Sequence, residues 1–245
     1  MEPPTDCDNE PVTEIPTYRK PQRIALRHWT SSLLALASLC ITTPDTPAQG
    51  LTQIIERLQA KFARTRSLAA DFTQIYRSPA SRPLWEDGKL IFSRPRRMRW
   101  EYQSPEKKYL VSDGKFLFFY VPAERQVVRS KLKDADDLRA AFAFLLGEFD
   151  IRRYFARIEL TWLESPLDAG NLLLRFIPKK PLPNFSELII EVTPYSLLLR
   201  RITVIEAGGG RSDFLLSNVR ENVSVSEAEF VFVPPPGVEV IDSGG

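Results

Sequence analysis

Residues 97–121 read RMRWEYQSPEKKYLVSDGKFLFFYV, and they contain the clearest fold signal in the chain. Apolar Met98, Trp100 and Tyr102 alternate with charged residues, which is the period of a β-strand with one buried face. Further along, Asp113-Gly114 separates two apolar segments, and tight hairpin turns favour this dipeptide because its residues tolerate positive φ. The stretch therefore predicts antiparallel strands joined by a hairpin.

Strand patterns continue on both sides of this stretch. The period of two begins at Leu68, and 127–132 predicts a further strand, so the first half of the chain is a meander rather than a βαβ unit. The second half predicts strands over 158–163, 172–177, 187–192, 198–206, 212–222 and 229–233. We expect roughly eleven or twelve strands in a large antiparallel sheet that curls or closes.

Two helices are predicted outside the sheet. An apolar stripe at i, i+3, i+4, i+7 and i+11 marks an amphipathic helix, with Leu51, Ile54, Ile55, Leu58 and Phe62 on its apolar side. A second helix begins at Asp134 or Asp136 and stops at Gly147. A short helical turn is expected to continue to Phe155.

The segment Phe116–Val121 has no polar face, so both of its sides must be covered. A packed β-sandwich core would cover them. A curled sheet whose apolar concave side holds a ligand beneath a helix would do so too. The periodicity leaves both architectures open.

The net charge indicates no particular kind of partner, because 33 Lys and Arg residues nearly balance 31 Asp and Glu residues. Arg94, Arg96, Arg97 and Arg99 lie near Trp100, a mixture that single-stranded nucleic-acid surfaces also show. The alternation instead places Arg97 and Arg99 on a solvated strand face, where they could meet an acidic partner or anionic lipid headgroups. We expect no nucleic-acid partner.

The N-terminal region has the order of a signal peptide. Basic residues precede the apolar run 33–41, and the polar, small-residue stretch 42–48 follows it. The run is shorter than the roughly 20 residues that span a bilayer. We predict cleavage after Ala48, which leaves residues 1–48 as leader and signal peptide and residues 49–245 as one exported domain.

Few groups suited to catalysis remain after that cut, because Cys7, His28 and Cys40 all precede it. We find no HExxH, GxSxG, P-loop or dinucleotide motif, and we expect no cofactor and no metal. Asp136 and Asp137 could form the carboxylate pair of a lipid- or glycolipid-processing enzyme. Adjacent acids at a helix start are more often caps, so we predict a binding protein and not an enzyme.

Four segments in order, SLAADFTQ (67–74), RPRRMRW (94–100), VSDGKFLFFYVP (111–122) and FVFVPPPGVEV (230–240), resemble the LolA-type periplasmic lipoprotein carriers. The resemblance implies a mainly β fold with an α lid: an incompletely closed antiparallel β-barrel, or curled sheet, covered by helices over an apolar cavity. It implies a monomer in the periplasm that binds lipoprotein acyl chains and moves lipoproteins from the inner to the outer membrane. Its partners would be acylated lipoproteins, the inner-membrane lipoprotein-releasing ABC transporter and the outer-membrane lipoprotein receptor.

The resemblance also implies roles for single residues. Arg94 would be the latch that fastens the closed lid, and Met98 stands where an aromatic residue is familiar in these carriers. We expect the cavity lining to include Phe92, Met98, Trp100, Tyr102, Phe118 and Tyr120, and the underside of the lid to include Leu138, Phe142 and Leu145. A carrier of another acylated or lipid cargo, or a lipoprotein-sensing module of the same fold, is the alternative reading.

Overall fold

The computed structural model describes residues 47–132, 151–180 and 185–243. All of them belong to one compact unit. The predicted leader and the predicted helix over 134–147 lie outside the described residues, and the cleavage after Ala48 stays a prediction.

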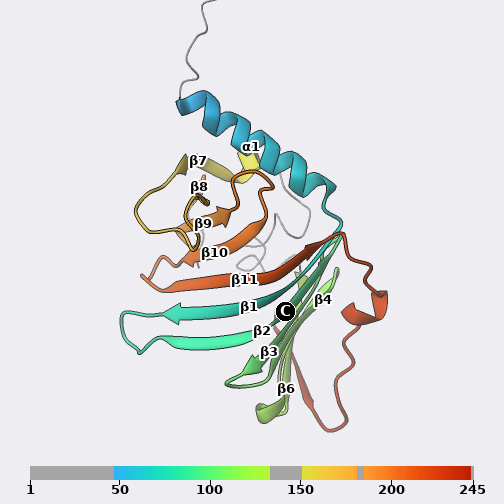
Figure 1. The fold of residues 1–245 in the computed structure, drawn as a ribbon. Helices are drawn as coiled ribbons and strands as arrows, with labels where there is room; N and C mark the ends of the chain where they lie inside the picture. The colour runs from blue at the N-terminus through green and yellow to red at the C-terminus, as the bar shows by residue number, and fades with distance from the viewer. Residues whose placement is uncertain (1–46, 133–150, 181–184, 244–245) are drawn as a thin grey trace, which may run out of the picture. The chain divides into compact units, whose positions relative to one another are not determined.

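Twelve strands form one sheet (Figure 1). Their order is β12-β6-β5-β4-β3-β2-β1-β11-β10-β9-β8-β7, so among the described residues β12 and β7 are the outermost strands and the sheet is open. Every neighbouring pair is antiparallel except β12 with β6, which is parallel. The strands are β1 (Ser67–Arg77), β2 (Leu84–Ser93), β3 (Arg97–Ser104), β4 (Lys108–Asp113), β5 (Phe116–Val121), β6 (Gln126–Lys131), β7 (Phe155–Leu160), β8 (Leu172–Pro178), β9 (Glu187–Val192), β10 (Leu199–Ile205), β11 (Arg211–Glu221) and β12 (Glu239–Ser243).

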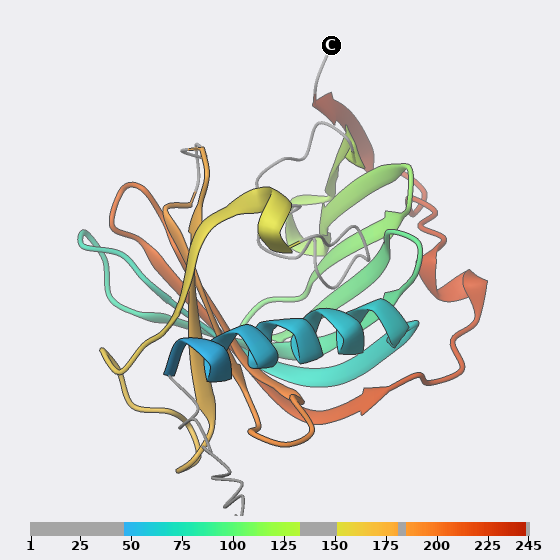
Figure 2. The same cartoon turned by 90° about the horizontal axis from the view of Figure 1, so that it is seen from above.

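The helices lie on the concave side of this curled sheet (Figure 2). The long helix α1 (Pro47–Arg64) contains the predicted apolar stripe, and its Leu58 and Phe62 are buried in the core. The short helix α3 (Ile151–Tyr154) leads into β7 and buries Ile151. The mainly β fold, with an open curled sheet covered by helical segments, confirms the predicted fold class.

The Asp-Gly hairpin is confirmed in detail. Gly114 adopts φ +95 between β4 and β5, a conformation that a side chain would strain. The Asp113 carboxylate accepts hydrogen bonds from the backbone N–H groups of Lys115 and Phe116, both at 2.7 Å. The turn therefore satisfies its own backbone donors and sets the β4–β5 register.

The C-terminal strand prediction is wrong. Residues 229–233 do not pair with the sheet, and the short 3-10 helix η3 (Glu227–Phe230) begins in this region, capped by the Ser226 hydroxyl. Phe230 is buried as a side chain packed on the sheet rather than as part of it. The unpredicted strand β12 forms after the prolines at 234–236, and its Asp242 pairs with Arg129.

The strand predicted over 158–163 ends earlier than expected. Strand β7 stops at Leu160, and a loop of residues 161–171 connects it to β8. Thr161 still donates its N–H to the carbonyl oxygen of Leu173, at 3.0 Å. After that bond the chain leaves the sheet.

Candidate functional site

A cluster of aromatic side chains lies on the concave face. The Trp100 ring is 4.9 Å from Phe72, 5.8 Å from Phe92 and 5.3 Å from Phe214, measured between ring centroids. All three pairs meet edge to face, the arrangement that aromatic quadrupoles favour. Strands β1, β2, β3 and β11 each contribute one ring, so the sheet register assembles the cluster.

A glycine in the middle of β2 makes room for this cluster. A Cβ atom on Gly88 would collide with the carbonyl oxygen of Glu101 and would lie 2.8 Å from the Phe72 ring. The absent side chain lets the Phe72 ring lie across the strand, 5.0 Å from the Tyr102 ring. The Tyr102 hydroxyl donates to the Gln74 side-chain oxygen at 2.8 Å, so its polar end is satisfied.

The concave face is polar at the end where β2 begins. Lys108 hydrogen-bonds the buried carboxylate of Glu86, and its Nζ lies 4.7 Å from the centroid of the Tyr102 ring. Burial raises the pKa of Tyr102 above its usual value, and the negative charge of Glu86 raises it further. This end therefore offers a satisfied ion pair and a neutral phenol, next to the apolar aromatic cluster.

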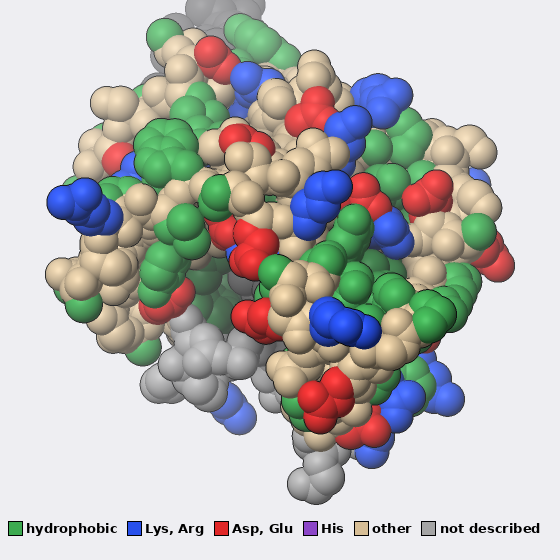
Figure 3. Space-filling model, turned by 90° about the horizontal axis from the view of Figure 1, so that it is seen from below, with side chains coloured by type: hydrophobic (Ala, Val, Ile, Leu, Met, Phe, Trp, Pro, Cys, Tyr) green, Lys and Arg blue, Asp and Glu red, His purple; other side chains and the backbone are tan. Residues whose placement is uncertain are grey.

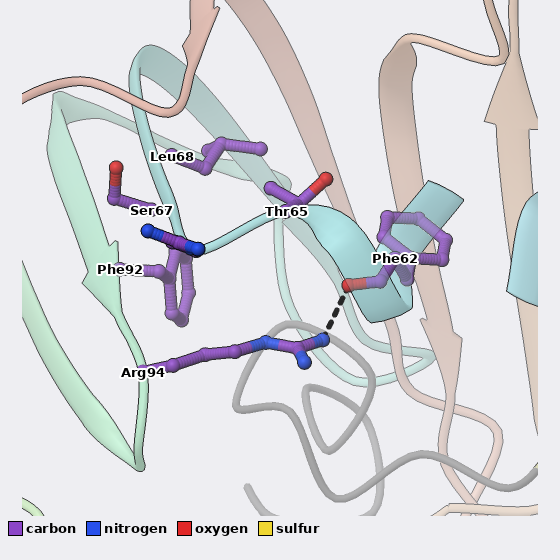
Figure 4. Close-up of a pocket in the computed structure, with 7 residues that line it drawn as sticks. Phe62, Thr65, Ser67, Leu68, Phe92 and Arg94 are labelled. Carbon is purple, nitrogen blue, oxygen red and sulfur yellow. Dashed lines mark hydrogen bonds between the residues drawn. The ribbon is translucent and has the colours of Figure 1, made fainter. Parts of the chain in front are cut away.

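Arg94 connects the sheet to the last turn of α1 (Figure 4). Its Nη2 donates to the carbonyl oxygen of Phe62, and its Nη1 donates to that of Ala63 at 3.2 Å. The last carbonyls of a helix have no partner within the helix and carry the negative end of its dipole, so a cation suits them. Burial lowers the pKa of Arg94 from its ordinary value, and the group stays charged because that value is so high.

The space around this contact is small. A hollow of about 10 Å³, bounded by Phe62, Phe92 and Arg94 among others, separates the helix end from β1 and β2. That volume is near the minimum for one water molecule. The hollow cannot hold an acyl chain while α1 is in this position.

Other polar contacts of α1 also come from cations. Lys61 donates to the carbonyl oxygen of Ser196 and pairs with the Glu221 carboxylate, both at 2.8 Å. Arg57 donates to the carbonyl oxygen of Tyr195 at 2.7 Å, in an exposed position. In these contacts α1 meets the sheet through bonds that water can reach.

Four of the predicted lining residues share the concave face. Phe92, Met98 and Trp100 are buried in the core, and Tyr102 packs against it. Leu138, Phe142 and Leu145 lie outside the described residues. Whether any of these residues touches an acyl chain stays a prediction.

The placement of Phe118 and Tyr120 on the concave face is wrong. Trp100 pairs with Leu110, and Leu110 pairs with Phe119, so Phe119 is the β5 residue on the Trp100 side. Phe118 and Tyr120 point the other way, where their rings lie 5.4 and 5.6 Å from the Phe232 ring. The C-terminal segment covers them there.

The prediction also missed residues that complete the concave face. Phe72, Phe214 and Ile202 come from strands far apart in the sequence, and all three belong to the apolar core. Phe72 could have been found, since it follows Leu68 and Ala70 at a period of two. Phe214 and Ile202 needed the β1–β11 and β10–β11 pairings.

Figure 3 shows the molecule hollowed in the view from below, with hydrophobic side chains inside the hollow and acidic ones near its edge. Within the described ranges, no three or more Cys, His, Asp or Glu side chains gather to hold a metal ion. Over the same residues, no helix is long and apolar enough to cross a membrane.

Comparison with known proteins gives a consistent result. The family model described as outer membrane lipoprotein carrier protein LolA matches residues 63–233. The outer-membrane lipoprotein carrier protein of Bordetella avium (strain 197N) is 30% identical over 216 residues, covering 88% of this chain and 98% of that protein. That of Pectobacterium carotovorum subsp. carotovorum (strain PC1) is 29% identical, covering 84% and 97%.

A solved structure shares the fold. An uncharacterized conserved protein from Thermus thermophilus superposes with a TM-score of 0.50, covering 80% of this chain and 100% of that one, at 14% sequence identity. Identity that low supports the likeness of fold alone.

Proposed function

Because the chain belongs to the LolA family of outer membrane lipoprotein carrier proteins, we propose that it carries lipoproteins by binding their acyl chains against the concave face of its sheet. The observation that supports this proposal is the apolar composition of the concave face. It gathers aromatic and aliphatic side chains from β1–β3 and β8–β11 beneath α1.

The physical need for such a carrier is large. Each methylene exposed to water costs about 0.8 kcal/mol, so the roughly forty methylenes of one lipoprotein cost on the order of 30 kcal/mol. An apolar face under a separable helix meets that need without catalysis. Release then requires only an acceptor with a more favourable apolar site.

The contacts of α1 suit such a cycle. Arg94 and Arg57 hold the helix through hydrogen bonds to backbone carbonyls that are partly open to water. Bonds of this kind exchange with water at small net cost. The helix can then move away to admit acyl chains, with Arg94 as the latch of the closed state.

The remaining parts of the proposal come from the family. We place the protein in the periplasm, as a monomer and without enzymatic activity. We expect it to receive lipoproteins from the inner-membrane lipoprotein-releasing ABC transporter and to pass them to the outer-membrane receptor.

Two adjacent residues of β5 provide a direct test. Phe119 is 38% exposed on the concave side, whereas Phe118 points to the opposite face. We would place a photo-crosslinking phenylalanine at each position in turn and irradiate the protein with a purified triacylated lipoprotein. Cross-linking at 119 and none at 118 is expected.

Equal cross-linking at both positions, or none at either, would contradict acyl binding on the concave face. Mass spectrometry of the products separates the cargo classes. If a free lipid rather than a lipoprotein becomes attached at 119 in cells, the protein carries another acylated cargo.

A further inference from the structure

The loop of residues 161–171 presents two large apolar side chains to solvent. Trp162 is 77% exposed and Leu163 is 82% exposed, and Leu167 in the same loop is 40% exposed. Single exposed apolar residues are common on protein surfaces, but an adjacent Trp-Leu pair this exposed is not.

This loop lies on the side of the sheet opposite the proposed acyl site (Figure 2). Its contacts include Arg201 and Glu191, which pair with each other across β9 and β10. The neighbouring residue Ile202 points the other way, into the concave core. The loop therefore covers the convex face of the sheet.

Buried charges hold the loop in place. Arg201 reaches the Glu164 carboxylate at 3.3 Å and the Ser165 carbonyl oxygen at 3.1 Å. Arg211 reaches the same Glu164 carboxylate at 2.5 Å. Two arginines of the sheet thus fix the residues that directly follow Trp162 and Leu163.

Glu191 holds the other half of the loop. Its carboxylate is 0% exposed, and it accepts hydrogen bonds from the Leu167 N–H and the Asn171 side-chain amide, both at 2.7 Å. A buried carboxylate with these partners disfavours any other loop conformation. The loop is therefore anchored directly after Trp162 and Leu163 and again at Leu167 and Asn171.

The same network removes charge from the loop tip. Glu164 directly follows the exposed pair in the sequence, and its carboxylate is paired with Arg201 and Arg211 of the sheet. The next acid, Asp168, pairs with Arg200 at 3.3 Å. The tip is left as an uncharged indole and an uncharged isobutyl group.

We infer that Trp162 and Leu163 form a membrane contact that inserts into the interfacial region of a lipid bilayer. An indole combines an apolar body with one N–H donor, which is why tryptophan favours the bilayer interface. An uncharged tip on an anchored loop inserts without desolvating a carboxylate. The inference goes beyond the proposed acyl binding and does not depend on it, because the loop and the concave face lie on opposite sides.

The contact is weak because it is small. Burying one such side chain favours partitioning by roughly tenfold or more. Two side chains therefore give weak, reversible binding.

The test is flotation of the purified protein with vesicles of phosphatidylethanolamine and phosphatidylglycerol. Trp162→Ser combined with Leu163→Ser should reduce the bound fraction at least tenfold. As the matched control, Val231→Ser with Val233→Ser removes two exposed apolar side chains of the C-terminal segment and should bind like wild type. Circular dichroism should show all variants folded, since these side chains are exposed.

Brominated lipids locate the contact. They should quench the fluorescence of the wild-type protein, and Trp162→Phe should abolish most of that quenching. Equal flotation of wild type and the loop variant would overturn the inference. So would a loop variant that floats normally but loses lipoprotein uptake from a purified partner, because the loop would then be a protein-docking surface. The carrier proposal fails separately, by loss of cross-linking at position 119.

Discussion

The two faces of the sheet are covered in physically different ways. On the concave face, α1 buries Leu58 and Phe62 and is tied down by cations that donate to backbone carbonyls, as Arg94 does. On the convex face, the loop 161–171 is tied down by carboxylates, including fully buried Glu191. Hydrogen bonds of the first kind exchange with water at small net cost, whereas the second kind holds a buried charge.

The difference follows from what each separation would leave behind. Moving α1 away exposes apolar surface and returns carbonyls and a guanidinium to water, where both are solvated. An acyl chain could then cover the apolar surface. Moving the loop leaves Glu191 and Arg201 paired with each other. It takes the Glu164 carboxylate away from Arg201 and two hydrogen-bond donors away from buried Glu191. Nothing in that network resembles a ligand site, so we read it as permanent structure.

The largest expected effect comes from breaking the convex network, the ion pairs that join Glu164 and Glu191 to Arg201 and Arg211 on the convex face. Arg201→Leu removes the charge partner of Glu191 and leaves its carboxylate uncompensated, which costs about 3–5 kcal/mol of unfolding free energy. Urea denaturation measures it. Arg200→Leu, next in sequence, breaks a more exposed pair with Asp168 and should cost about 1 kcal/mol or less. Equal losses in the two variants would show that the pair with buried Glu191 stabilises the protein no more than an exposed pair does.

A smaller effect is expected at the concave cover. Arg94→Leu removes two hydrogen bonds to the end of α1 and should cost about 1.5 kcal/mol. Hydrogen exchange should accelerate in α1 while the loop 161–171 stays protected. Arg125→Leu is the matched control. Arg125 also donates to a backbone carbonyl, that of Gly237, and neither residue belongs to α1. Slower exchange in α1, or no change, would argue against a latch.

The smallest effect is a pH dependence. Burial acts to raise the pKa of Asp213, but hydrogen bonds from Arg211 and Thr203 outweigh it and hold the pKa below its usual value. As the pH falls, Asp213 is therefore protonated in the unfolded chain before it is protonated in the folded protein. The stabilisation that the ionised carboxylate gives at neutral pH is lost through the acid range, from about pH 5 downward. Asp213→Asn should flatten the plot of urea midpoint against pH there. An unchanged slope would show that Asp213 contributes nothing to acid sensitivity.

Much of the fold was predictable because its signals are local. Alternation at Met98, Trp100 and Tyr102 reports which side chains share a face, and Asp113-Gly114 reports a turn, without knowledge of any other strand. The amphipathic stripe of α1 is equally local. Phe118 and Tyr120 were misplaced because both parities of β5 are apolar, so the alternation carried no information there.

The convex network had no comparable signal. Glu164, Glu191 and Arg201 come from three separate segments of the chain, and each alone looks like a surface charge. The early end of β7 was missed for a related reason: Trp162 and Leu163 continue an apolar pattern although they are exposed. A predictor that assumes apolar residues are buried extends the strand through them.

By itself, the sequence determined the kind of each element: a helix over Leu51–Phe62, strands with a period of two, a hairpin at Asp113-Gly114, and a family likeness spread along the chain. Only the tertiary structure decided which face of β5 meets Trp100, that Arg94 ends at the last turn of α1, and that Trp162 and Leu163 point to solvent. The reason is physical. Periodicity is set by backbone geometry within a few residues, whereas register, helix docking and charge pairing are set by contacts between segments as distant as β1 and β11.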